Sequence, residues 1–117
     1  MSSQDYLKQA AAMIRRAALA RKQEVDELRH ELDAKDQQRR ELVNQKEMER
    51  ALRLKEAGDA DNDMEKGSKT REAHILSVEK SQIEQEYTYQ KKQLDEQLSN
   101  MQRSIDELNQ MAQSLGG

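Results

Sequence analysis

The chain has 117 residues, of which 34% are hydrophobic and 3% aromatic, and this composition is too polar for a large globular core. It contains no proline, tryptophan or phenylalanine, and the absence of cysteine rules out a disulfide framework and a thiolate metal cluster. Charged residues make up 37% of the chain, but 20 basic residues nearly balance 23 acidic ones, and a net charge of −3 argues against a dedicated nucleic-acid binder. Many charges with little net charge and no proline are typical of long helices rather than of a disordered chain.

A first helix is predicted over residues 4–57, because neither glycine nor proline interrupts this stretch. Ser2 and Ser3 can cap its start, and Asp5 places a negative charge near the positive end of the helix dipole. Alternating steps of three and four define its seam, the line of residues expected to face another helix. The seam residues are Leu7, Ala11, Ile14, Ala18, Arg21, Val25, Leu28, Leu32, Lys35, Arg39 and Leu42. Charged residues interrupt its later part, so the half nearer the loop is expected to be softer.

A loop is predicted over residues 58–67, which read GDADNDMEKG, with Gly58 suited to end a helix. Three aspartates in it alternate as the first ligands of a calcium loop do: Asp59, Asp61 and Asp63. However, Met64 stands where a calcium loop needs glycine, and Thr70 stands where it needs a bidentate glutamate. The preferred interpretation is an acidic, solvated turn without a metal, and a weak calcium site is the alternative.

A second helix is predicted over residues 69–114, with Ser68 and Thr70 as caps. Its seam residues are Leu76, Lys80, Ile83, Tyr87, Gln90, Leu94, Leu98, Met101, Ile105, Leu108, Ala112 and Leu115. The spacing is most regular after Leu94. Two successive steps of four, from Gln90 to Leu94 to Leu98, are expected to unwind the supercoil locally.

The distribution of charge along the sequence favours a hairpin, in which the two halves of the chain pack against each other. Residues 1–22 hold five basic residues and one acidic residue, whereas residues 94–117 hold four acidic residues and one basic residue. If residue i faces residue 125 − i, apolar seam residues meet one another and these oppositely charged ends lie together. The predicted fold is therefore all-α: a single domain, residues 1–117, formed by a long two-helix antiparallel coiled-coil hairpin. The alternative is an elongated parallel homodimeric coiled coil.

Histidine and arginine patterns give weaker indications. Glu27 and His30 have the Glu-x-x-His spacing of di-iron helical bundles, but only one copy of the motif is present, so surface residues are the preferred interpretation. A basic amphipathic segment suggests an alternative function, binding to a membrane surface or to nucleic acid through the basic N-terminal third. The residues that would carry it are Arg15, Arg16, Arg21 and Lys22.

The favoured function is that of a non-enzymatic coiled-coil interaction protein, an adaptor, spacer, chaperone or assembly subunit that docks partner helices. No phosphate-binding loop, nucleophile with a histidine base or cofactor motif is present in the sequence. Apolar residues off the seam of the loop-proximal half are the expected partner-binding residues: Met48, Leu52, Leu54, Ile75 and Val78. Off-seam apolar residues also allow two copies to associate as a dimer of hairpins. Without an apolar span or a signal-peptide pattern, an intracellular, soluble location such as the cytoplasm is expected.

Overall fold

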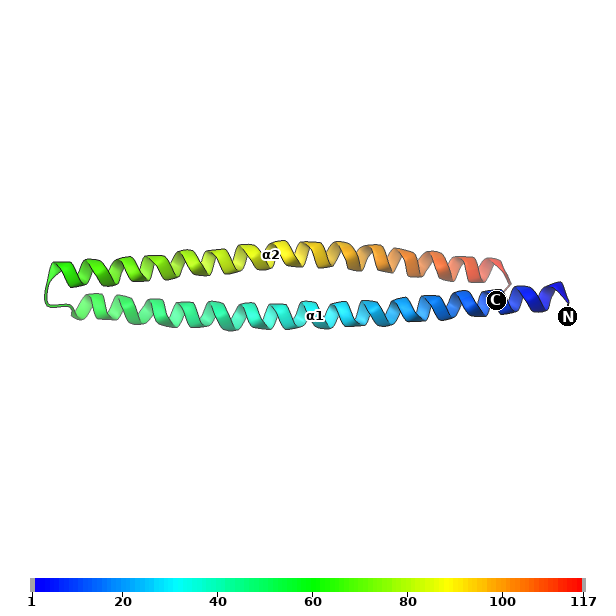
Figure 1. Ribbon diagram of the computed structural model, residues 1–117, viewed down its shortest axis with the longest axis horizontal. Helices are drawn as coiled ribbons and strands as arrows, with labels where there is room; N and C mark the ends of the chain where they lie inside the picture. Colours follow the sequence, from blue (N-terminus) through cyan, green and yellow to red (C-terminus); the bar gives the residue numbers. More distant parts are fainter. Residues whose placement is uncertain (1, 117) are drawn as a thin grey trace. The chain divides into compact units, whose positions relative to one another are not determined.

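The structure is a computed structural model that describes residues 2–116. Helix α1 spans Ser3–Asp59 and helix α2 spans Asp63–Ser114. The two helices are joined by a tight turn and run antiparallel, so the predicted all-α coiled-coil hairpin is confirmed and the chain does not adopt the extended parallel arrangement (Figure 1). Contacts group the chain into two compact units. Unit 1 comprises the described residues up to Leu32 and from Lys92 onward, and unit 2 comprises Asp33–Lys91.

A reciprocal cap closes the first turn of α1. The backbone N–H and the hydroxyl of Ser2 donate to Oδ2 of Asp5 at 3.1 and 3.0 Å, and the backbone N–H of Asp5 donates to the Ser2 hydroxyl at 3.3 Å. These bonds satisfy N–H groups that have no partner within the helix. The predicted helix start is confirmed, with Ser2 as the capping residue.

The turn between the helices is shorter than the predicted loop of residues 58–67, because only residues 60–62 separate α1 from α2. Asn62 is the N-cap residue of α2. Its side-chain Oδ1 accepts a hydrogen bond from the backbone N–H of Glu65 at 2.8 Å, and its carbonyl accepts one from the N–H of Lys66 at 3.1 Å. A strong cap placed this close to the end of α1 makes a longer loop unnecessary.

The residues expected to bound the loop lie inside the helices instead. Gly58 belongs to α1 and Gly67 to α2, and neither has a positive φ. The prediction that Ser68 and Thr70 cap the second helix is wrong. The hydroxyl of Thr70 donates to the carbonyl of Lys66 at 2.8 Å, which is the bond that a threonine makes inside a helix.

Replacing Asn62 by alanine is expected to lower the free energy of unfolding by about 1 kcal/mol, because the first turn of α2 loses its side-chain acceptor. The measurement is thermal or urea unfolding followed by circular dichroism. Asp61→Ala, which removes the neighbouring exposed side chain but not the cap, should change the stability by less than about 0.5 kcal/mol. Equal effects of the two substitutions would contradict the assignment of the cap to Asn62.

Unit 1 contains the best-packed part of the seam. Ala18, Val25 and Ile105 form a buried cluster, and three partly buried residues of α2 pack against it: Leu98, Met101 and Leu108. Ala11 and Ala112 are completely buried. Small residues of α1 thus face larger residues of α2, which lets the two helices approach closely, as the alternating spacing predicts.

Unit 2 has a more polar seam. Its fully buried side chains are Ala57 and Ala73, which lie toward the turn. The remaining seam is half-buried and largely polar, with Lys35, Arg39 and Lys46 on α1 and Lys80, Ile83, Tyr87 and Gln90 on α2. Because little apolar surface is buried here, the packing supports the expectation that the half nearer the turn is the softer one.

The α1 seam changes phase in unit 2. Leu42, a predicted seam residue, is 37% exposed, whereas its neighbour Val43 is half-buried. The inward-facing residues therefore run from Lys35 to Arg39 to Val43, two steps of four. A helix with 3.6 residues per turn drifts from a strict 3.5-residue repeat, and an extra step of four corrects the drift. The prediction for Leu42 is wrong for this reason, although the residue lies only one position from the seam.

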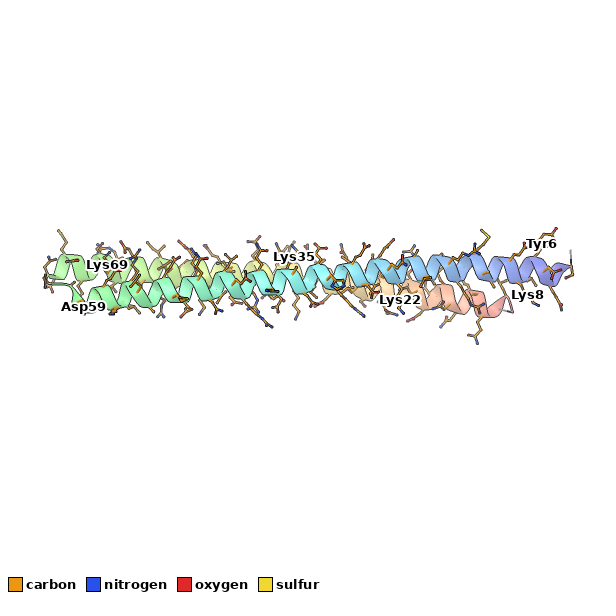
Figure 2. All side chains as sticks on the ribbon, turned by 90° about the horizontal axis from the view of Figure 1, so that it is seen from below. Tyr6, Lys8, Lys22, Lys35, Asp59 and Lys69 are labelled. Atoms are coloured by element: carbon orange, nitrogen blue, oxygen red, sulfur yellow. The ribbon has the colours of Figure 1, made fainter. Side chains whose placement is uncertain are left out.

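The first turns of α1 extend past the end of α2 in unit 1. Residues 2–9 are all exposed, and Leu7, although it has seam spacing, is 44% exposed. Figure 2 shows Tyr6 and Lys8 on this extension. Gln4, Leu7 and Lys8 line a pocket with Ser114, Leu115 and Gly116, so the end of α2 covers this part of α1 only partly.

Candidate interaction surfaces

Ion pairs join the two helices along the unit 2 seam. Their shortest N–O distances are 2.6 Å for Lys46–Glu79, 2.9 Å for Lys80–Glu47, 2.9 Å for Lys69–Glu56, 3.1 Å for Arg53–Glu72 and 3.2 Å for Arg39–Glu84. The residue numbers total 125 in the Lys46, Lys69 and Arg53 pairs, which confirms the predicted register within unit 2. Partly exposed pairs of this kind contribute little stability individually, but they are lost if the helices slip by less than a heptad.

Arg39 lies at the centre of the most connected group. Its guanidinium contacts Asp36 at 2.8 Å and Glu84 at 3.2 Å, and Cζ lies 4.6 Å from the centre of the Tyr87 ring. The hydrogen bond from Arg39 holds the pKa of the Asp36 carboxyl below its usual range. Burial, and then a hydrogen bond with Asp36, raises the pKa of the Tyr87 hydroxyl. At neutral pH Arg39 and the Asp36 carboxylate are therefore charged and Tyr87 is protonated.

Two carboxyl groups nearer the turn are also hydrogen-bonded to basic side chains. Hydrogen bonds from Lys80 and Lys69 lower the pKa of the Glu47 and Glu56 carboxyls, respectively. Lys69 contacts Glu56 at 2.9 Å and Glu72 at 3.7 Å, so these two glutamates, one from each helix, lie on the same flank of the seam. Residues that share a helix face with Glu56 or with Glu72 therefore lie on this flank as well.

Four of the five predicted partner-binding residues gather around that flank. Leu52 precedes Glu56 by four positions and Ile75 follows Glu72 by three, so both share a helix face with these glutamates. Met48 lies one turn before Leu52, and Val78 lies one turn after Ile75. The exposed fractions are 74% for Met48, 52% for Leu52, 55% for Ile75 and 44% for Val78. These four residues are called the apolar patch below.

Leu54, the fifth predicted residue, does not join the apolar patch. It is 42% exposed, but it follows Leu52 by two positions, which turns it by about 200° around the helix. Leu54 therefore lies on the other flank of the seam. The sequence identified it as an off-seam residue without specifying which flank it occupies.

Unit 1 holds an open groove with a volume of about 490 Å³. Leu28 and Met101 contribute apolar surface to it, and Gln97 and Asn100 contribute amides. Three glutamates of α1 complete the lining: Glu24, Glu27 and Glu31. Within residues 2–116, these carboxylates form no ion pair or side-chain hydrogen bond. No sequence motif indicates this groove, although the three glutamates have the same three-and-four spacing as the seam.

The residues of the basic segment are all exposed: Arg15, Arg16, Arg21 and Lys22. Arg21 was predicted to occupy the seam, and its exposure corrects that prediction. A guanidinium on a long stem remains in water when the surrounding seam is as tightly packed as it is around Ala18 and Val25.

The three aspartates near the turn lie on different parts of the hairpin. Asp59 ends α1, Asp61 lies in the turn, and Asp63 begins α2. Among the described residues, no group of three or more histidine, cysteine, aspartate or glutamate side chains is arranged to hold a metal ion. The alternative of a calcium site therefore has no support from the geometry. Glu27 lines the unit 1 groove, and His30 and His74 are exposed.

Neither helix contains, within the described residues, an apolar stretch that could cross a lipid bilayer. Comparison of the chain with protein-family models, with curated proteins and with solved structures finds no match.

Proposed function

We propose that the protein is a non-enzymatic coiled-coil interaction protein, an adaptor, spacer, chaperone or assembly subunit, that docks a helix of a partner protein on the apolar patch. One observation carries the proposal: in unit 2 charged groups fill much of the seam, while large apolar side chains face outward. An exposed group of large apolar side chains is typical of a protein-binding surface.

The apolar patch suits a helical ligand. Leu52 and Ile75 come from opposite helices and flank one side of the seam, and Met48 and Val78 widen this surface onto the outer faces. A partner helix with apolar residues at positions i, i+3 or i+4, and i+7 would cover such a surface with one face. Leu52 and Ile75 are about half exposed, so covering them contributes about 1 kcal/mol each, and Met48 and Val78 add further apolar area to the contact.

The soft packing of unit 2 favours the same function. Little apolar surface holds the two helices together between residues 33 and 56, so their spacing can adjust when a third helix binds. The ion pairs keep the register while this adjustment takes place, because each pair fixes one position along the other helix.

The double substitution Leu52→Gln and Ile75→Gln is expected to abolish capture of the partner and to leave helicity unchanged. Glutamine forms helices nearly as well as leucine, and both positions are exposed. The measurement is quantitative affinity capture from cells, with circular dichroism of the purified variants. The matched control replaces two equally exposed apolar residues of unit 1, Leu19→Gln and Met111→Gln. The proposal fails if both variants capture the same proteins in the same amounts.

A further inference from the structure

Helix α1 carries a second stripe with coiled-coil spacing, which lies beside the seam on one flank. It starts with exposed or half-buried apolar and small residues and ends in the three glutamates of the unit 1 groove. Its members are Tyr6, Ala10, Met13, Ala17, Ala20, Glu24, Glu27 and Glu31, at alternating steps of four and three. Met13, Ala17 and Ala20 are all exposed, and Met13 is 68% exposed. The stripe thus has the spacing of a coiled-coil face, yet its apolar residues are exposed.

The stripe is self-complementary when two copies run antiparallel. A two-fold axis near Ala20 places residues 13 and 27 at the same level, because each lies seven positions from residue 20. The exposed thioether of Met13 then lies over the groove beside Glu27, where Leu28 and Met101 offer apolar surface. Methionine is the side chain best able to fill an irregular gap of this kind.

Charge is complementary in the same arrangement. Arg16 lies on the outer side of α1 next to Met13 and Ala20, three positions after one and four before the other. Residue 16 and residue 24 are each four positions from residue 20, so Arg16 of one copy lies level with Glu24 of the other. The three groove carboxylates have no ion-pair partner within residues 2–116, and Arg16 is exposed.

Small residues allow the two helices to meet. Ala17 and Ala20 would lie nearest the two-fold axis, where the helix axes are closest, and alanine leaves room for that approach. A two-fold contact brings the same patch of each copy together and closes the assembly at two copies.

We propose that the protein forms an antiparallel homodimer through unit 1, in which Met13 of each copy enters the groove of the other and Arg16 pairs with Glu24 and Glu27. The occupant of the groove is a second copy of this chain, because the same helix supplies both the acidic groove and the basic, apolar segment that matches it. The dimer contact uses none of the residues of the apolar patch, so it can fail or succeed independently of the proposed partner binding.

Single cysteines test the position of the two-fold axis, since the chain has none of its own. Ala20→Cys is expected to give a covalent dimer rapidly with a short bifunctional maleimide, because the two copies of residue 20 lie side by side. Ala51→Cys, an equally exposed alanine of unit 2, is the matched control and should cross-link slowly. A chain that remains monomeric by light scattering at high micromolar concentration, or that cross-links as fast through residue 51, overturns the proposal.

A charge exchange tests the pairing itself. Arg16→Glu and Glu24→Arg should each weaken the dimer by roughly tenfold, because every dimer then contains two like-charge contacts. The double variant, which carries both substitutions in one chain, should recover the original dissociation constant. Dissociation constants come from sedimentation equilibrium. A double variant as weak as the worse single variant shows that these residues do not meet, and it refutes the proposed geometry.

Discussion

Replacing Val25 by aspartate is expected to unpair the helices of unit 1 while hydrogen exchange in unit 2 keeps its native rate. Val25 is 3% exposed and belongs to the buried cluster with Ala18 and Ile105. A carboxylate at this position loses its water and finds no basic group in the cluster, and a buried unpaired charge costs more than about 4 kcal/mol. This cost exceeds what a short apolar seam can sustain, so the helices of unit 1 separate.

Hydrogen exchange resolved by peptide mass spectrometry measures this effect segment by segment. Amide protection should fall over residues 3–32 and 92–114 and persist over residues 40–85. Leu19→Asp is the control, because it places the same charge on the same helix at a side chain that is 57% exposed and should change stability by about 0.5 kcal/mol or less. Loss of protection that begins in unit 2, or equal effects of the two substitutions, would show that the cluster does not hold unit 1 together.

Features of the fold that follow from residue spacing and charge were predictable from the sequence. The seam of α2 was predicted throughout, because alternating steps of three and four leave one line of apolar residues that only another helix can cover. Every seam residue predicted on α2 is buried or half-buried. The register of unit 2 was also predictable, since opposite charges on its two helices were expected to face each other. Pairs such as Lys46 with Glu79 show it directly.

Features that depend on small differences in energy were not predictable from spacing alone. Leu42 and Val43 are both apolar, and only the accumulated drift of the helix decides which of them faces inward. Gly58 suggested a helix end, but the Asn62 cap lets α1 continue to Asp59. A glycine lowers the stability of a helix by only about 1 kcal/mol relative to alanine, and the helical turns on either side of it stabilise the helix by more than this.

The candidate surfaces were predictable only in part from residue spacing. Spacing identified Leu52, Leu54 and Ile75 as off-seam residues, but only the contacts of Lys69 with Glu56 and Glu72 show which of them share a flank. The groove of unit 1 was missed because glutamates at helical spacing are usually a solvated face. Its significance depends on apolar residues of both helices, Leu28 and Met101, lying beside those glutamates.

Replacing the charged seam of unit 2 by leucine should make the protein more stable and its pairing less specific. The variant combines Arg39→Leu, Lys46→Leu and Lys80→Leu, all at half-buried positions. The carboxylates left behind, on Glu84, Glu79 and Glu47, are 40 to 41% exposed and can turn into water. Three leucines then bury apolar surface where long charged side chains lay, which should raise the free energy of unfolding by about 1 to 3 kcal/mol.

The specificity should fall because leucines tolerate a shift of one heptad that the ion pairs forbid. In the native register Arg39 meets Glu84 and Lys80 meets Glu47. A shift of seven residues sets Arg39 against Ser77 or Lys91 and Lys80 against Arg40 or Leu54, so both pairs are lost, whereas leucine at these positions has no charged partner to lose. Multi-angle light scattering should then detect additional oligomers, and spin labels at residues 48 and 78 should report more than one distance. Arg40→Leu, at a side chain that is 69% exposed and contacts only Asp36 of its own helix, should cause neither change. A triple variant that is less stable than the original chain would mean that the ion pairs contribute more than their desolvation costs, and the charged seam would then be a source of stability rather than of register.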